Sequence, residues 1–371
     1  MIAVIGDTHI GRSLYGFDLT QSIRCAMYEF FNVCVRMKVG YAIHLGDLFD
    51  KCSPTIAQEK LVLQWCNEFE RAGIPLYIMV GNHDVTNKVE VPSALECIRV
   101  SPFKRVRVVD RPLRLSRGVV MLPFPSPGLY ESQDAYDRDI HVCETDTVCT
   151  HLNVIGSKVG EEGNSYRAAA HYVPSRVIDD ACVVIGGHIH KPQKVGSNVV
   201  IVGSAERMTF DEENDCKRFL LHDRYSDHAE SKFVARQAIE LLTLEIDVTQ
   251  WGSGRVGCTT SDVVCVISKK DLVNKVVRVK SFVDESTIVD WKEVEGRLYE
   301  KGAKHVFVMP RIKVSKEDKK YKQERKTSDP MQEAAAFIKS KIKSREERSV
   351  LLQMFKDMQK EVEHEGTSKV Y

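Results

Sequence analysis

The feature that most constrains this chain is a pattern that recurs between residues 1 and 202. Short runs of apolar, mostly β-branched residues each stop abruptly at a small polar cluster, and a segment with helical spacing often follows. The runs occupy residues 2–5, 41–45, 76–80, 119–122, 147–150, 182–185 and 199–202. Strands that alternate with helices build layered α/β cores, and continuously apolar strands are typical of sheets covered on both faces. The sequence therefore predicts a layered α/β core.

Two segments between these runs, residues 19–38 and 56–71, place apolar residues at helical spacing. In the first, Met27, Phe30 and Phe31 share one face, which predicts an amphipathic helix. In such cores, functional residues usually lie on the loops beyond the carboxyl ends of the strands. The polar clusters that close the apolar runs are therefore the first candidates for a functional site.

Five of these polar clusters carry aspartate, asparagine or histidine. In chain order they are Gly6-Asp7-Thr8-His9, Gly46-Asp47, Gly81-Asn82-His83-Asp84, Thr150-His151 and Gly187-His188-Ile189-His190. Taken alone, a strand-end aspartate is usually a helix or turn cap, and an isolated histidine is more often a satisfied core or surface residue than a ligand. Five such clusters at five strand ends together favour a shared metal site.

The residue types in these clusters fit phosphoester chemistry. Splitting a phosphodiester needs a strong nucleophile at neutral pH and positive charge against phosphorus, and two metal ions about 3.5 to 4 Å apart supply both. Such a pair needs a bridging carboxylate, and mixed imidazole, carboxylate and amide-oxygen ligands suit manganese, iron or zinc better than calcium. The sequence therefore predicts two divalent metal ions per chain, with manganese, iron and zinc all open.

The order DxH, GD, GNHD, a lone strand-end histidine and GHxH resembles the calcineurin-like metallophosphoesterase superfamily. The resemblance implies a sandwich of two central mixed β-sheets flanked by helices. It implies two ligand sets that share Asp47 as the bridge: Asp7, His9, Asp47 and His190 for one ion, and Asp47, Asn82, His151 and His188 for the other. His83 matches the family's non-ligand histidine, which protonates the leaving oxygen or stabilises its charge, with Asp84 expected to orient it. The alternative for His83 is a hydrogen bond that only supports a ligand.

Two further stretches are similar to the SbcD family, the nuclease subunit of the SbcC and SbcD complex, which is related to the eukaryotic meiotic recombination eleven nuclease. One is GDLFDKCSP at residues 46–54, and the other is GSAERMTFDE at residues 203–212, followed by Lys217. The resemblance implies a manganese-dependent exonuclease on double-stranded DNA and an endonuclease on single strands and hairpins, in recombination, repair or replication. It implies an SbcC-type coiled-coil ATPase as partner and a homodimer within a heterotetramer. Asp50 stands where some relatives carry a catalytic histidine.

The chain is predicted to contain four parts. Residues 1–236 form the nuclease core and 237–314 a small α+β capping domain, with strands expected at 244–248, 263–267, 275–279 and 305–308 and a helix at 290–301. Residues 315–328 are a charged linker and 329–371 a C-terminal helical segment. In the SbcD family, parts in this order select the form of DNA and bind the ATPase.

The C-terminal segment carries apolar side chains at helical spacing. They are Phe337, Ile342, Leu351, Met354, Phe355 and Met358. Most such stripes pack on the protein's own core, but at the end of a lysine-rich tether this one favours docking on the ATPase. DNA contacts are expected from basic residues in loops beside the metal motifs, namely Arg12, Lys51, Lys158 and Arg207. For each of these four, a solvated surface charge is the alternative.

Composition limits the remaining classes of protein. The net charge of +1 excludes a uniformly basic domain that coats itself with nucleic acid, and the 11 cysteines are scattered without a CxxC pair, which favours reduced thiols. No apolar run approaches the roughly 20 residues of a membrane span. We therefore expect a cytoplasmic protein with no membrane contact. A phosphatase and a metal-poor scaffold that tethers an ATPase to DNA remain as alternatives, although the complete ligand set disfavours the scaffold.

Overall fold

The computed structural model describes residues 1–86, 93–115, 118–126, 129–130, 132–159, 164–165, 171–223, 230–236, 238–247, 259–267, 269–283 and 289–312. The chain forms two compact units, one of residues 1–281 with 287–310 and the other of 282–286 with 311–371. This division draws no boundary at residues 236, 314 or 328, so the predicted domain limits stay predictions. The predicted linker and the C-terminal apolar side chains lie outside the described residues.

The first large sheet has the strand order β16-β15-β1-β4-β5-β6. Its strands are β1 (Ile2–Ile5), β4 (Tyr41–His44), β5 (Leu76–Met79), β6 (Val106–Val109), β15 (Arg218–Asp223) and β16 (Glu230–Ala235). Strands β1, β4, β5 and β6 run parallel, whereas β15 pairs antiparallel with both β1 and β16. The sheet is therefore mixed, and its parallel strands end at one edge.

The second large sheet has the order β13-β14-β12-β9-β8-β7. Its strands are β7 (Leu113–Leu115), β8 (Val119–Leu122), β9 (Thr147–Thr150), β12 (Val183–Gly186), β13 (Gln193–Val195) and β14 (Val199–Ile201). The four central strands are parallel and the two edge strands antiparallel. All seven apolar runs predicted as strands are strands of these two sheets.

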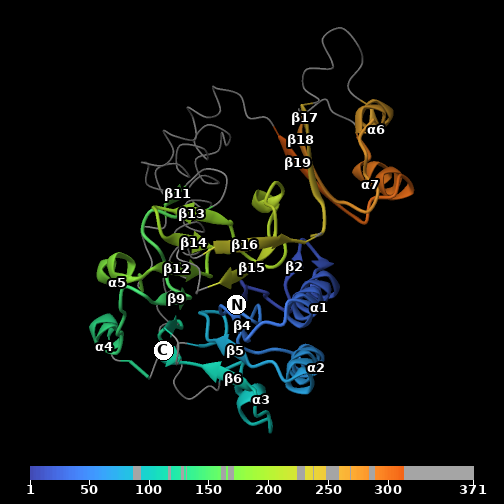
Figure 1. The fold of residues 1–371 in the computed structure, drawn as a ribbon. Coiled ribbons are helices and arrows are strands. Elements are labelled where there is room, and N and C mark those ends of the chain that lie inside the picture. Colours follow the sequence, from blue (N-terminus) through green and yellow to red (C-terminus); the bar gives the residue numbers. More distant parts are fainter. Residues whose placement is uncertain are drawn as a thin grey trace, which may run out of the picture. The chain divides into compact units, whose positions relative to one another are not determined.

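The two sheets pack face to face through an apolar layer. Val4 and Ile43 of the first sheet and Met121 and Ile185 of the second belong to one buried cluster. Helices α1 (Thr20–Arg36) and α2 (Ile56–Ala72) cover the outer side of the first sheet, and α4 (Gln133–Arg138) and α5 (Ser175–Asp180) cover that of the second (Figure 1). The predicted α/β sandwich of two mixed sheets flanked by helices is confirmed.

Helix α2 shows how local sequence fixes these layers. Thr55 and Gln58 form a reciprocal capping box at its start, and Gly73 ends it in a left-handed conformation. Its buried face carries Trp65, whose indole N–H donates to the carbonyl of Met27 on α1 at 2.9 Å. The predicted spacing of 56–71 therefore corresponds to a helix that packs against α1 and the sheet.

A small three-stranded sheet follows the core in the sequence. It contains β17 (Leu241–Asp247), β18 (Val276–Val283) and β19 (His305–Ile312), accompanied by α6 (Thr260–Ile267) and α7 (Trp291–Glu300). The expected strands at 244–248, 275–279 and 305–308 and the helix at 290–301 correspond to these elements.

The strand predicted at 263–267 is wrong, because this stretch is helix α6. Thr259 and Asp262 cap each other at its start, which satisfies amides that a strand would pair with a neighbour. Val263 and Ile267, four residues apart, are buried, and α6 packs on α7. Tertiary packing and the cap therefore override the β-branched composition.

The remaining short elements lie in connections. They are β2 (Ser13–Leu14), β3 (Phe17–Asp18), α3 (Glu96–Arg99), β10 (Lys158–Val159), β11 (Asn164–Ser165) and the 3-10 turn η1 (Phe210–Glu212). Among the helices that the structure describes, none is both long and apolar enough to cross a membrane.

Candidate metal centre

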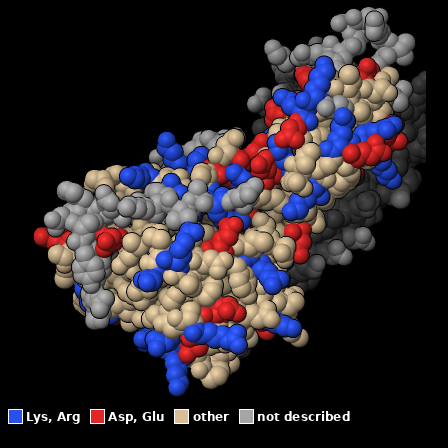
Figure 2. Space-filling model, turned by 45° about the vertical axis from the view of Figure 1, so that its right-hand side comes forward, with Lys and Arg blue, Asp and Glu red and all other residues tan. Residues whose placement is uncertain are grey.

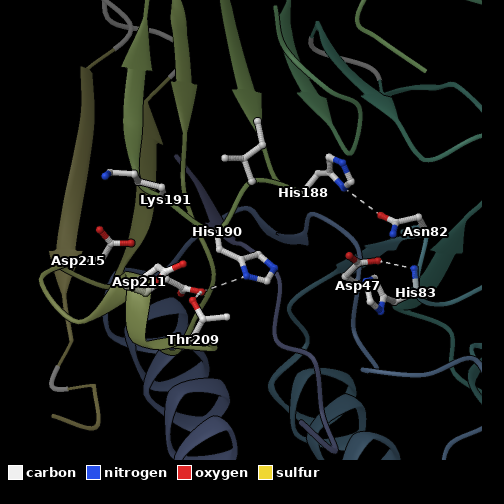
Figure 3. Close-up of a pocket in the computed structure, with 11 residues that line it drawn as sticks. Asp47, Asn82, His83, His188, His190, Lys191, Thr209, Asp211 and Asp215 are labelled. Carbon is white, nitrogen blue, oxygen red and sulfur yellow. Dashed lines mark hydrogen bonds and ion pairs between the residues drawn. The ribbon is translucent and has the colours of Figure 1, made fainter. Parts of the chain in front are cut away.

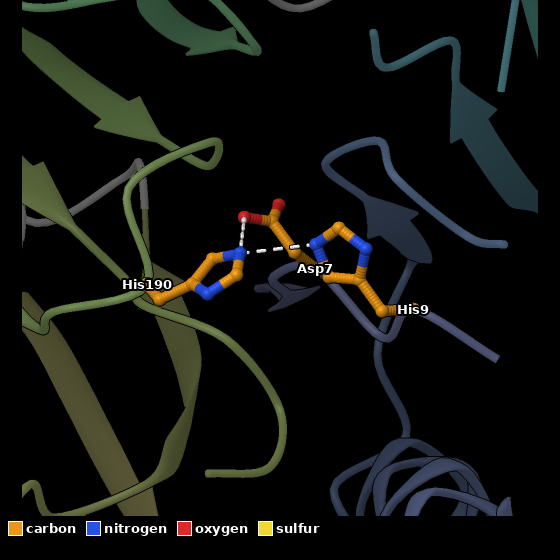
Figure 4. A group of neighbouring side chains, drawn as sticks. All are labelled: Asp7, His9 and His190. Carbon is orange, nitrogen blue, oxygen red and sulfur yellow. Dashed lines mark hydrogen bonds and ion pairs between the residues drawn. The ribbon is translucent and has the colours of Figure 1, made fainter. Parts of the chain in front are cut away.

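All seven predicted ligands lie in loops that follow the carboxyl ends of parallel strands. Asp7 and His9 follow β1, Asp47 follows β4, Asn82 follows β5, His151 follows β9, and His188 and His190 follow β12. Since the two sheets pack face to face, three loops of one sheet and two of the other meet at a common edge. Residues up to 183 positions apart in sequence therefore converge, as Figures 3 and 4 show.

Asp7, His9 and His190 form the first cluster (Figure 4), with ligand atoms all within 4.8 Å of one another. The Nε2 atoms of the two histidines face each other at 3.0 Å, and Asp7 Oδ2 lies 3.9 Å from His190 Nε2. Within the described part of the chain, Asp7 Oδ2 is buried without a hydrogen-bond partner. A buried carboxylate oxygen needs a donor or a cation, so this donor set fits a divalent ion.

Asp47, His151 and His188 form the second cluster, also within 4.8 Å. The side-chain oxygen of Asn82 joins it, 2.9 Å from His188 Nδ1 and 3.2 Å from His151 Nε2. These are one carboxylate, one amide oxygen and two imidazoles around one point, which is a ligand set suited to a borderline divalent metal.

Asp47 lies between the two clusters. Its Oδ2 is 3.3 Å from His151 Nε2 of the second cluster and 3.7 Å from His9 Nε2 of the first. Its Oδ1 accepts a hydrogen bond from the backbone N–H of His83 at 2.8 Å. One oxygen is thus anchored while the other faces both clusters, which fits the predicted bridge.

Burial and mutual charge set the protonation of these groups. Burial raises the pKa of Asp7. Burial would also raise that of Asp47, but the charge and hydrogen bond of His151, together with the charges of His9 and His83, outweigh burial and lower the pKa of Asp47 well below its usual range. Conversely, burial disfavours a charged His151, yet Asp47 raises its pKa to about 9. A divalent ion here would replace the positive charge of the His151 proton.

Three of the predicted ligands have backbone conformations that non-glycine residues rarely adopt. The φ angles of His9, Asp47 and His188 are 46°, 52° and 67°. Such strain persists where the surroundings over-determine a residue, and it gathers at functional sites. Glycine is also required beside the ligands, because a Cβ on Gly187 would lie 2.9 Å from Asp7 Oδ1.

Two ligand histidines are oriented through their other ring nitrogen. His151 Nδ1 lies 2.9 Å from the carbonyl oxygen of Leu45, and His190 Nδ1 lies 3.3 Å from Glu212 Oε1. Contacts of this kind fix the tautomer that leaves Nε2 for a metal. Glu212 closes the GSAERMTFDE run, but sequence reasoning gave it no role, because nothing local to residue 212 indicates a contact with His190.

His83 lies beside the ligands, with its ring 4.7 Å from that of His9. Its Nδ1 is 2.9 Å from the carbonyl oxygen of Asp50, so Nδ1–H donates there and Nε2 remains as the proton-exchanging nitrogen. The ligand atoms of His9, Asp47 and His83 also lie within 4.8 Å of one another. Distance alone does not separate His83 from the ligands, and its predicted catalytic role stays a prediction.

Asp84 has other partners than the one predicted. Its carboxylate is fully buried and accepts backbone N–H groups of Gly81 at 2.9 Å and Phe49 at 3.1 Å, whereas His83 turns to Asp50. Burial raises the pKa of Asp84 to about 7. Asp84 therefore links the loop after β5 to the loop after β4. The contact that orients His83, which was expected from Asp84, is made by the carbonyl of Asp50.

The four basic residues predicted to meet DNA separate into two kinds. Lys51 and Lys158 are exposed, and Arg12 lies 3.3 Å from Asp50 beside the centre. Arg207 instead donates to the backbone carbonyls of Ile239 at 2.7 Å and Asp215 at 2.9 Å, so it ties internal loops together. On the face drawn in Figure 2, basic and acidic side chains are intermixed, as the net charge of +1 leads one to expect.

The centre opens into a hollow of about 310 Å³ (Figure 3). Metal-cluster residues form one wall, and Lys191, Thr209 and Asp211 form part of another. The hollow is lined by residues of both clusters and by His83.

Comparison with known proteins agrees with this geometry. Residues 1–192 match the profile of the family described as calcineurin-like phosphoesterase. The DNA double-strand break repair protein Mre11 of Sulfurisphaera tokodaii is 31% identical over 85 residues, 23% of this chain and 22% of that protein. The Mre11 protein of Methanocaldococcus jannaschii is 25% identical over 103 residues, 27% of this chain and 27% of that protein. The Mre11 protein of Thermoplasma acidophilum is 30% identical over 89 residues, 24% of this chain and 24% of that protein.

These matches span about a quarter of the length of the Mre11 proteins. The family profile, in contrast, covers 192 of the 371 residues and includes all seven predicted ligands. With buried His/Asp clusters at the strand ends of a two-sheet sandwich, the protein belongs to the calcineurin-like phosphoesterase family, as a metallophosphoesterase distantly related to Mre11.

Proposed function

We propose that this protein is a manganese-dependent exonuclease on double-stranded DNA and an endonuclease on single strands and hairpins. It would act as the nuclease subunit of an SbcC–SbcD type ATP-dependent complex that processes DNA ends in recombination, repair or replication. The observation that carries the proposal is the position of Asp47, one oxygen of which faces both His/Asp clusters at the base of an open hollow. The similarity to Mre11 repair proteins supports DNA as the substrate.

The two predicted ligand sets would hold two divalent ions; their mixed imidazole and oxygen donors suit manganese, iron or zinc, and the resemblance to the SbcD family favours manganese. When bound, such a pair supplies a nucleophile at neutral pH and positive charge for the phosphate. The chain's own residues would do the rest. His83 lines the hollow, and its Nε2 can give a proton to the leaving oxygen, because its Nδ1 is engaged by the carbonyl of Asp50.

The partners follow from the resemblance to SbcD and the order of the chain's parts. We propose that double-stranded ends and hairpins enter the hollow and that residues 329–371 bind a coiled-coil ATPase. A homodimer within a heterotetramer is also proposed. Helices α1 and α2 are both candidate surfaces for the dimer, and Ile56 at the start of α2 is 84% exposed.

The test is a set of parallel hydrolysis assays on metal-stripped protein. Linear duplexes with defined ends, hairpins, circular plasmid and para-nitrophenyl phosphate are each supplied with manganese or magnesium, with and without the ATPase and ATP. We expect manganese-dependent degradation of ends and hairpins, absent in Asp47→Asn. Efficient turnover of para-nitrophenyl phosphate with intact DNA would instead identify a phosphatase, the alternative open to the family.

A further inference from the structure

A buried lysine lies directly behind the metal ligand His190. The side chain of Lys217 is 0% exposed, and its Nζ donates to three acceptors: the backbone oxygen of His190 at 3.0 Å, Ser204 Oγ at 2.9 Å and Glu212 Oε2 at 2.6 Å. An ammonium group has three N–H donors, so these contacts use all of them. Lys217 therefore holds the backbone at His190 directly.

Glu212 connects this lysine to the ring of the same histidine. Its Oε2 accepts from Lys217 and from the backbone N–H of Met208 at 3.2 Å, whereas Oε1 lies 3.3 Å from His190 Nδ1 and accepts from Thr209 Oγ1 at 3.2 Å. The side chain of Glu212 is 8% exposed. Each of its oxygens is thus held in place, and one is directed at the imidazole.

These contacts decide which nitrogen of His190 can bind a metal. A carboxylate oxygen only accepts, so Nδ1 must carry the proton in that contact and Nε2 is left with its lone pair. His190 Nε2 is the atom that faces His9 and Asp7 in the first cluster. Chain connectivity places Glu212 there through the turn η1, 22 residues after the histidine.

We propose that Glu212 and Lys217 are positioning residues for the ion held by Asp7, His9, Asp47 and His190. Glu212 fixes the tautomer and the rotation of the His190 ring. Lys217 fixes the position of Glu212 relative to the His190 backbone. This assignment rests on the proposed two-metal function. It concerns one ion of the pair, because His151 of the other cluster takes its orienting contact from the Leu45 carbonyl.

A second buried ion pair offers a matched control. Glu206 is 0% exposed and its Oε2 accepts from Arg236 at 2.9 Å, while Oε1 accepts from the backbone N–H of Arg207 at 2.8 Å. Glu206 lies in the same connection between β14 and β15. Among the contacts described for it, none reaches a predicted metal ligand. Removing its charge tests burial and ion pairing without touching His190.

The experiment measures manganese binding to the metal-stripped full chain by the loss of the free-ion paramagnetic resonance signal. Wild type is expected to bind two ions. In Glu212→Gln the amide nitrogen must face Lys217 or His190, both donors, so one ion should bind about 10- to 100-fold more weakly while the other is unchanged. Glu206→Gln should keep both affinities even though its stability falls. A double variant, Glu212→Gln with Lys217→Met, removes both buried charges at similar volume and should show the same selective loss.

A spectroscopic readout accompanies the titration. In ¹⁵N-histidine-labelled, metal-stripped protein at alkaline pH, the His190 resonances, identified by their loss in His190→Gln, should show the proton on Nδ1 in wild type and in Glu206→Gln but a mixture of the two tautomers in Glu212→Gln. Wild-type affinity for both ions in Glu212→Gln, or an equal loss in Glu206→Gln, would overturn the positioning role while leaving the metal centre intact. A wild-type chain that binds no divalent ion would overturn the proposed function as well.

Discussion

At the scale of single residues, the site is organised by histidines that use one ring nitrogen for support and keep the other for chemistry. His151 is held by the carbonyl of Leu45, and His83 by that of Asp50. Both contacts engage Nδ1, so Nε2 is the functional atom in each. The same device serves a predicted metal ligand in one case and the proposed proton donor in the other, and mutation distinguishes the two roles.

Replacing His83 by alanine should lower hydrolysis by about 100- to 10,000-fold, the usual contribution of a general acid. Manganese content and DNA binding should stay near wild type, because the predicted ligand sets remain. Initial rates on a hairpin substrate, with bound manganese measured in the same samples, check this. His141→Ala, an exposed histidine, is the control. Retained turnover, or loss of one ion, would contradict the assignment of His83 as a non-ligand acid.

A different histidine should make folding sensitive to acid. His44 is fully buried: its Nδ1 accepts the backbone N–H of Gly46 at 3.3 Å and its Nε2 lies 3.0 Å from Thr8 Oγ1, which itself donates to Leu48. A second ring proton, on Nδ1, would point at the backbone N–H of Gly46, which is itself a donor. Burial accordingly lowers the pKa of His44 from 6.5 to about 3.

Since the folded pKa of His44 is depressed, the unfolded chain takes up the proton first. Above pH 6.5 this residue adds no pH dependence, and stability is lost as the pH falls from 6.5 toward 3. At pH 5 the loss should be about 2 kcal/mol. Denaturant unfolding of wild type and His44→Gln at pH 7 and pH 5 measures it. An equal pH difference in the two proteins would contradict the prediction.

At the scale of elements, the turns that follow the strands determine the positions of the predicted ligands. A Cβ on Gly81 would lie 2.2 Å from Asp47 Oδ1, so the loops after β4 and β5 approach too closely for any side chain at residue 81.

A glycine in helix α7 is in the opposite situation. Gly296 lies mid-helix between the buried residues Val294 and Leu298, and a Cβ there would meet nothing within 4 Å.

Gly296→Ala should therefore stabilise the protein by about 0.5 to 1 kcal/mol, because alanine has the higher helix propensity and a less flexible unfolded backbone. The free energy of unfolding in urea gives the value. Gly81→Ala is the contrasting variant and should weaken metal binding by displacing Asp47. A neutral or destabilising Gly296→Ala would show that α7 does not govern the measured transition.

At the scale of the whole molecule, the metal centre joins the two sheets. Asp7, Asp47 and Asn82 come from loops of the first sheet, and His151, His188 and His190 from loops of the second. Bound ions would cross-link these loops and bind only the folded chain. Metal binding and folding should therefore be linked.

Chelation should lower the melting temperature, corresponding to about 3 kcal/mol for each bound ion when the free metal had stood at 100 times its dissociation constant. Calorimetry with excess manganese and then with chelator measures the change. Asp47→Asn, which lacks the shared carboxylate, should respond much less. Identical melting of wild type with and without chelator would argue against ions that bridge the sheets.

The proposed partner interaction belongs to this scale as well. Removing residues after Lys326 should leave manganese-dependent nuclease activity and abolish association with the ATPase, because the core carries the metal centre and the tether carries the apolar stripe. Co-purification and hairpin cleavage by the truncated chain check both halves. Unchanged association would contradict the proposed docking segment.

The sequence by itself determined the seven apolar strands of the core, the sandwich class and the seven candidate ligands, whereas the face-to-face packing of the two sheets brings those ligands together. Each ligand directly follows an apolar run, and the carboxyl ends of parallel strands necessarily meet at one edge. Only the tertiary structure decided what lies behind the ligands. Glu212 reaches His190 and Arg207 reaches the carbonyl of Ile239 through folded loops, and α6 is a helix because α7 offers it an apolar surface. Such contacts join residues distant in sequence, and their energies exceed the local preferences that a sequence displays.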